Sequence, residues 1–192
     1  TTDIVGKDHA HAVRLDAEAT PEIKKARLHR KVATAVFFES NGGQQQESKM
    51  RYSQRWPEYA AQWDRMVVNP ARINEFFRLA KAAIANKARY VAIEDATKVP
   101  WPLIAVVHRR ESDMSFATYL GNGQSLGRVT TLAPVGRGPW PSFEAGAVDA
   151  LHFDGLDKII DWRLEKVLFE TEVINGPGYF NLGIPSCYVW GG

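Results

Sequence analysis

Residues 100–116 read PWPLIAVVHRRESDMSF, and the rest of the chain is organised around this stretch. Pro100 and Pro102 suit the approach and the first turn of a helix, where a missing backbone N–H costs nothing. The residues that follow would be apolar on almost every side of that helix, which predicts a buried helix rather than an amphipathic one. Such a helix would bring Glu111 to its C-terminal end, at the edge of the core.

Glu111 is the first candidate for chemistry. Partial desolvation raises the pKa of a carboxyl group, and the negative end of a helix dipole acts in the same direction. A carboxyl group that keeps its proton near neutral pH is the general acid that cleavage of a glycosidic bond needs. The alternative is a solvated residue paired with Arg109 or Arg110. His108, one helical turn earlier, either tunes this carboxyl group or is an ordinary core histidine.

Length, composition and charge limit the possible classes. A chain of 192 residues, 45% of them hydrophobic, fits one domain or one domain with an extension, and disorder is not indicated. A net charge of +2 gives no signal for nucleic acid, although it is compatible with an anionic polymer. The single cysteine, Cys187, excludes an internal disulfide framework and a cysteine-rich zinc site. No apolar run approaches the roughly 18 residues of a membrane span, so stable membrane insertion is not predicted.

The remaining pattern predicts a mainly α fold with a small β-hairpin. Apolar residues recur at helical spacing in several segments, and this predicts helices over residues 53–68, 72–96 with a bend at Asn86, 142–152 and 161–173. Residues 115–120 alternate like a strand, a glycine-rich turn follows, and residues 128–132 could form the partner strand. Residues 1–52 are predicted to be a helical N-terminal extension of unknown role, and residues 53–192 the main domain.

Several motifs occur in an order that resembles a known family. The matching pieces are Ala88-Arg89-Tyr90, Val99-Pro100-Trp101, Val106-Val107-His108 with Glu111-Ser112, Asn122-Gly123, Val148-Asp149-Ala150-Leu151, Leu156-Asp157-Lys158, Asp161-Trp162, Asn175-Gly176 with Gly178-Tyr179, and Ser186 with Tyr188 and Trp190. In this order they resemble phage and prophage lysozyme-family proteins of the lysozyme and lytic transglycosylase superfamily. The likeness covers about two thirds of the chain, from about residue 58 onward.

The resemblance implies an α+β lysozyme-like fold, with the hairpin on one wall of an active-site cleft. It implies cleavage of the β-1,4 bond between N-acetylmuramic acid and N-acetylglucosamine in peptidoglycan, by a monomer with Glu111 as the acid. No metal or organic cofactor is implied, and the partner would be the peptidoglycan glycan strand. The candidate catalytic residues are Glu111, Asp113 and Thr130, and the candidate substrate-binding residues are Ser112, Asn122, Thr131, Glu144, Asn175, Tyr179 and Tyr188.

Some questions stay open at this point. Lysozyme-type hydrolysis uses two carboxylates, and the second is either Asp113 or Glu144. A lytic transglycosylase would instead use one Glu first as acid and then as base, and a sugar hydroxyl would attack in place of water. This chain has Val173 at the position where the transglycosylase motif has Tyr. Thr130 or Thr131 either orients a water or an N-acetyl group, or is an ordinary strand residue. Two other classes are a non-catalytic peptidoglycan-binding module and a partner-binding helical protein.

Overall fold

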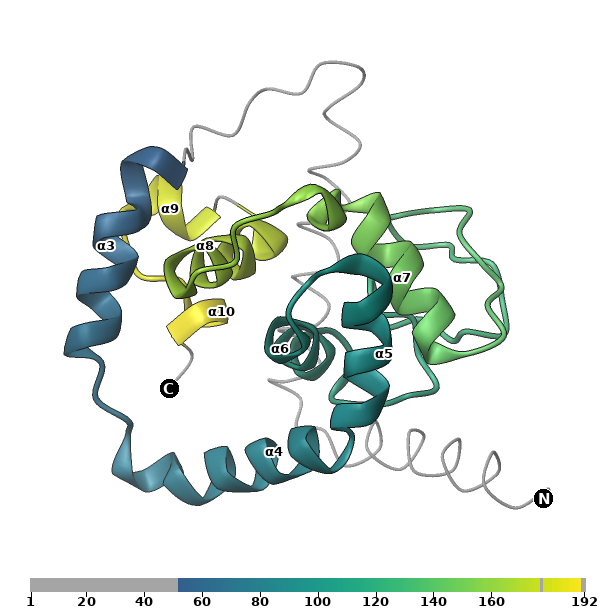
Figure 1. Cartoon of the computed structure of the whole chain (residues 1–192), viewed down its shortest axis with the longest axis horizontal. Coiled ribbons are helices and arrows are strands. Elements are labelled where there is room, and N and C mark those ends of the chain that lie inside the picture. Colours follow the sequence, from purple (N-terminus) through teal and green to yellow (C-terminus); the bar gives the residue numbers. More distant parts are fainter. Residues whose placement is uncertain (1–51, 177, 191–192) are drawn as a thin grey trace. The chain divides into compact units, whose positions relative to one another are not determined.

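The computed structural model describes residues 52–176 and 178–190 (Figure 1). The predicted helical extension over residues 1–52 therefore lies outside the described residues, except for its last position. The described chain divides into two compact units. One comprises residues 108–154, and the other comprises residues 52–107 and 155–190. Each unit is described by itself.

The fold is mainly α, as the sequence predicts. The α-helices are α3 (Tyr52–Arg65), α4 (Ile73–Ala85), α5 (Lys87–Thr97), α6 (Trp101–Ser112), α7 (Phe143–Phe153), α8 (Leu164–Asn175), α9 (Gly178–Leu182) and α10 (Cys187–Trp190), with 3-10 turns η1 (Pro70–Arg72) and η2 (Leu156–Lys158). Within the described ranges, no helix is long and apolar enough to cross a membrane.

Helix α6 is buried, as its sequence predicts. The Pro100 carbonyl accepts the backbone N–H groups of Leu103 at 3.0 Å and Ile104 at 3.2 Å, so the helix begins directly after the first proline. Leu103, Ile104 and His108 are fully buried, whereas Val106 keeps 44% of its surface exposed. The division of the chain into two compact units falls within this helix, between Val107 and His108.

The predicted bend at Asn86 separates two helices. The Asn86 side chain donates from Nδ2 to the Ala82 carbonyl at 3.0 Å, and its backbone leaves helical geometry with φ −104° and ψ 12°. An asparagine side chain that bonds to the preceding turn competes with the backbone ladder. The long predicted helix is therefore divided into α4 and α5.

In the unit of residues 52–107 and 155–190, α3 lies alongside α8 (Figure 1). Their shared core contains Tyr59, Leu168 and Phe169. The Tyr59 ring meets the Phe169 ring edge-on with centroids 6.1 Å apart, and its hydroxyl donates to the buried carboxylate of Glu172. Burial and the Glu172 carboxylate raise the pKa of Tyr59, so the hydroxyl stays a donor.

The predicted β-hairpin is wrong. No strand occurs among the described residues around Glu111, where the chain makes one isolated bridge between Thr118 and Ser125. The segment expected to be the partner strand uses its backbone differently: the Gln124 Oε1 atom accepts the N–H groups of Thr131 and Leu132 at 3.0 and 2.9 Å. Since a side chain takes these donors, they are not available for a strand ladder.

The unit of residues 108–154 is built on α7 and the long loop before it. Ser142 caps α7, because its Oγ accepts the Ala145 N–H at 3.2 Å, and the helix begins where the sequence predicts it. The His108 ring packs against Phe116 and Phe143, with centroids 4.7 and 4.3 Å away. His108 is thus part of an aromatic core at the base of α7.

Candidate active site

Glu111 lies in the last turn of α6 and is half-buried. His108 begins that turn and is held in the aromatic core, which fixes the rotation of the helix about its axis. Ser112 ends the helix, and its Oγ donates to the His108 carbonyl at 3.1 Å. Packing one turn earlier, at His108, therefore helps to set the position of Glu111.

The chain leaves α6 through two residues in the left-handed region. Asp113 has φ +55° and Met114 has φ +62°, and the Met114 N–H returns to the His108 carbonyl at 3.2 Å. Two consecutive non-glycine residues in this region are costly, and such conformations concentrate at functional sites. Asp113 also forms an ion pair with Arg109. Asp113, one of the two candidates for the second carboxylate, is thus held by a cation of the last turn of α6.

A tight turn presses against the backbone of Glu111. The Gly123 N–H donates to the Tyr119 carbonyl at 2.8 Å and closes this turn. Gly123 has φ +71°, and a Cβ atom placed there would lie 2.7 Å from the Glu111 carbonyl oxygen. Only glycine both adopts this left-handed conformation easily and leaves room for the Glu111 carbonyl oxygen.

Asn122 and Gln124 join this turn to the following loop. The Asn122 Nδ2 donates to the carbonyls of Leu132 at 3.2 Å and Ala133 at 3.3 Å. The Gln124 Nε2 donates to Thr131 Oγ1 at 3.0 Å. Both amide side chains therefore tie the loop to the turn that contacts Glu111. The Asn122 amide and the Thr131 hydroxyl, which are predicted to bind substrate, already form hydrogen bonds within the protein.

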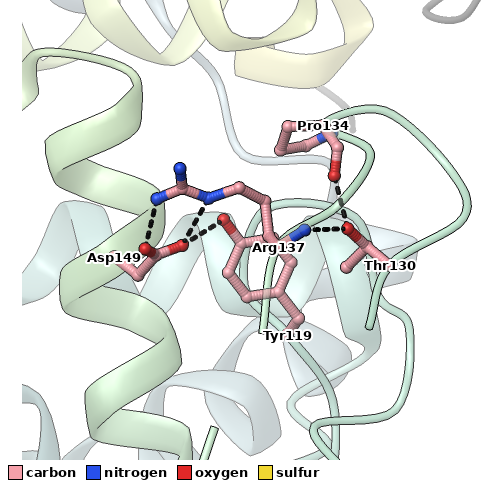
Figure 2. A network of polar contacts seen from close by, with 5 residues as sticks. All are labelled: Tyr119, Thr130, Pro134, Arg137 and Asp149. Atoms are coloured by element: carbon pink, nitrogen blue, oxygen red, sulfur yellow. Dashed lines mark hydrogen bonds and ion pairs between the residues drawn. The ribbon is translucent and has the colours of Figure 1, made fainter. Parts of the chain in front are cut away.

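A polar network fastens the loop to α7 (Figure 2). The Arg137 guanidinium donates to both carboxylate oxygens of Asp149, with Nε to Oδ2 at 3.1 Å, and the Tyr119 hydroxyl donates to the same Oδ2 at 3.0 Å. The Tyr119 ring stacks on Trp140 with centroids 4.0 Å apart. Burial and the Asp149 charge raise the pKa of Tyr119, which keeps this hydroxyl protonated.

Thr130 belongs to the same network. Its side chain is buried, and its Oγ1 donates to the Pro134 carbonyl at 2.6 Å and accepts the Arg137 N–H at 2.9 Å (Figure 2). The hydroxyl shapes the loop that carries Arg137. Its predicted role in orienting water stays a prediction.

Two further carboxylates lie at the two ends of α7. Glu144 is in the first turn, two residues after the Ser142 cap, where a negative charge suits the helix dipole. Asp154 follows the last residue of α7, and no sequence pattern identified it as a site residue. Although its side chain reaches solvent, desolvation by the surrounding protein raises its pKa to about 6, with a second contribution from the charge of Glu111. A carboxylate at the negative end of a helix is the one sequence signal that could have marked it.

The other predicted binding residues belong to the second unit. Asn175 is the last residue of α8, Tyr179 lies in α9, and Tyr188 is buried in α10. The Cys187 thiol donates to the Tyr179 hydroxyl at 3.0 Å, and this contact raises the pKa of Tyr179. Seven of the predicted residues, Glu111, Ser112, Asp113, Asn122, Thr130, Thr131 and Glu144, share the unit of residues 108–154.

The described residues contain no group of three or more His, Cys, Asp or Glu side chains that could hold a metal ion. No protein-family model, curated protein or solved structure matches the chain. The arrangement itself is a half-buried glutamate at a helix end, beside a turn and a loop that are fixed by hydrogen bonds. It could supply acid–base chemistry on a polar substrate.

Proposed function

We propose that this protein cleaves peptidoglycan glycan strands as a lysozyme-like glycoside hydrolase, with Glu111 as the general acid. The observation that carries the proposal is the placement of Glu111 at the half-buried end of α6. A buried aromatic cluster fixes the helix at His108, and Gly123 packs on the Glu111 carbonyl. A general acid must be held within hydrogen-bond reach of its target, and this packing restricts its movement.

The sequence resemblance to lysozyme-family proteins supplies the substrate class. In the proposed reaction, Glu111 donates its proton to the oxygen that leaves the muramic acid carbon, and water completes the cleavage. The strained exit of the helix at Asp113 and Met114 supports a functional role for this end of α6. Lytic transglycosylation is the second candidate; it needs one acid only, and Val173 in place of the motif Tyr argues against it.

The test is the activity of Glu111→Gln on purified cell walls. This variant keeps the shape of the side chain and removes the proton donor, so turnover should fall by roughly 10²–10⁴, the usual worth of general acid catalysis. Wall binding, measured by co-sedimentation, should be retained. Glu58→Gln, on the exposed face of α3, is the matched control and should behave like the parent.

Mass spectrometry of the released fragments separates the two chemistries. Reducing muramic acid ends are expected from hydrolysis, whereas 1,6-anhydro ends alone would show transglycosylation. Parent-level activity in Glu111→Gln would show that this site is not the catalytic one. A binding module would show wall binding without turnover in the parent, and a partner-binding protein would show neither.

A further inference from the structure

Helix α4 carries an apolar stripe that is exposed to solvent. Among the residues that the structure describes, none of those in α4 is buried, and the helix packs on its sequence neighbours η1 and α5. Ile73, Phe77 and Ile84 keep 42, 60 and 62% of their surface exposed. Ala80 is exposed as well. Because residues three and four apart lie on the same face of a helix, these four side chains form one apolar stripe about 16 Å long.

Three more apolar side chains are exposed shortly before α4. Met66, Val67 and Val68 follow the end of α3, and Val67 keeps 86% of its surface exposed. Single exposed apolar residues are ordinary on a protein surface, whereas consecutive ones that lead into an apolar stripe mark an interaction surface. Residues 66–84 therefore form one stretch with the character of an interaction surface.

Cations border the apolar stripe. Lys81 lies four residues after Phe77 and three before Ile84, so it is a neighbour of both on the helix surface. Arg78 lies one turn before Lys81, and both basic side chains are exposed. The apolar stripe of α4 therefore has a positively charged edge.

This charge favours an anionic partner over a second copy of the chain. Glu75 is the only acid in the sequence of α4, and its Oε2 atom already lies 2.9 Å from the Nε atom of Arg72. A second copy of α4 would bring its own Arg78 and Lys81 to the interface, and like charges at close range repel. A surface with negative charge would instead attract both cations.

An anionic lipid surface fits this stretch better than an acidic protein. A groove on a protein accepts side chains at regular helical spacing, whereas the lipid interface accepts apolar side chains in any arrangement. Lipid therefore accommodates both the apolar stripe and the irregular segment of residues 66–68. With 13 residues, α4 is shorter than the about 20 residues that cross a bilayer, so it would lie along the surface.

We propose that α4 and the segment before it form a membrane-surface site for anionic phospholipid. The apolar stripe enters the boundary between headgroups and acyl chains, together with the side chains of residues 66–68. Arg78 and Lys81 extend along this boundary, and their charged ends reach the headgroup phosphates. The inference does not rest on the proposed cleavage of peptidoglycan, and separate measurements test the two.

The experiment is co-sedimentation of the full chain with vesicles of phosphatidylglycerol and phosphatidylcholine, and with vesicles of phosphatidylcholine alone. The parent should bind the anionic vesicles more tightly, and about 0.5 M salt should weaken this binding by screening the charges. Phe77→Gln should bind anionic vesicles about tenfold more weakly, because the stripe loses its aromatic ring. Lys81→Gln should bind them about fivefold more weakly, because one cation near the headgroups is lost.

Matched controls make the same chemical change outside α4. Ile160→Gln replaces an apolar side chain that is 97% exposed, and Lys158→Gln replaces an exposed cation of η2. Both should bind anionic vesicles like the parent. Since every substituted side chain is exposed, circular dichroism should show the parental helix content in all four variants.

Hydrogen exchange of the parent locates the contact without any substitution. Anionic vesicles should slow the exchange of amides within residues 66–84. No binding of the parent to these vesicles, equal binding by Phe77→Gln and Ile160→Gln, or slowed exchange confined to another segment would overturn the proposal.

Other partners give different results. Binding to polyglutamate without binding to vesicles would indicate an acidic protein, and a parent dimer that Phe77→Gln abolishes, without vesicle binding, would indicate a second copy. Either result overturns the lipid site. A parent that binds anionic vesicles through residues 66–84 but cleaves no purified peptidoglycan would support the lipid site and refute the proposed function alone.

Discussion

Replacing Gly123 with Ala tests whether the turn against α6 positions Glu111. The new Cβ atom would lie 2.7 Å from the Glu111 carbonyl oxygen, while ordinary contact begins at 3.4 Å. Since the atom it meets is backbone, the turn or the end of α6 must move by several tenths of an ångström. Gly123 also has φ +71°, and a side chain in that conformation costs about 1–2 kcal/mol.

Gly136→Ala is the matched control, because Gly136 has φ +80° but no heavy atom within 4 Å of the added Cβ. Its free energy of unfolding should fall only by the conformational cost of about 1–2 kcal/mol. The free energy of unfolding of Gly123→Ala should fall by a further amount of about 1–3 kcal/mol, the usual cost of forcing a group into packed surroundings. Urea unfolding followed by tryptophan fluorescence measures both losses.

Activity gives the second readout. Displacing a catalytic group by about 1 Å can cost about 10²-fold in rate, and the shift expected here is smaller. Gly123→Ala should therefore clear cell-wall suspensions more slowly than Gly136→Ala, by less than that factor. Its wall binding should remain, because the change moves the end of α6 rather than removing a surface. Equal losses of stability and of turnover in the two variants would refute the idea that the Gly123 contact positions Glu111.

Two further predictions concern polar contacts that join distant parts of each unit. Asp149→Asn should destabilise the protein by about 1–3 kcal/mol, because it weakens the charged bonds from Arg137 and Tyr119 and part of this pair is screened by solvent. A double-mutant cycle with Arg137→Met, measured by urea unfolding, should show coupling above about 0.5 kcal/mol, and additive losses would contradict the network. Tyr59→Phe should cost about 1–3 kcal/mol, because it leaves the buried Glu172 carboxylate without this donor, whereas Tyr52→Phe should cost less. The stability lost through Tyr59→Phe should be smaller in a Glu172→Leu background. Thermal unfolding of the parent, Tyr59→Phe, Glu172→Leu and the double variant measures this difference.

The sequence alone determined those helices that are begun, ended or capped by residues close to their own ends. Pro100 and the apolar run after it define the start and burial of α6, Asn86 separates α4 from α5, and Ser142 caps α7. Each depends on propensity, capping or periodicity, which act over one or two turns of chain. The candidate acid, Glu111, follows from the same local pattern because it lies in the last turn of the helix that the apolar run forms.

Only the tertiary structure decided how the loop after α6 is held. The predicted hairpin failed because the Gln124 side chain takes backbone donors seven and eight residues away. Tyr119 and Asp149 are 30 residues apart in sequence, and a hydrogen bond joins their side chains. Strand composition and residue type are properties of short segments, whereas hydrogen-bond partners and charge–charge distances depend on how the chain returns to itself. The candidate acid could therefore be predicted from its helix, but the hydrogen bonds that hold the loop beside it could be found only from the folded chain.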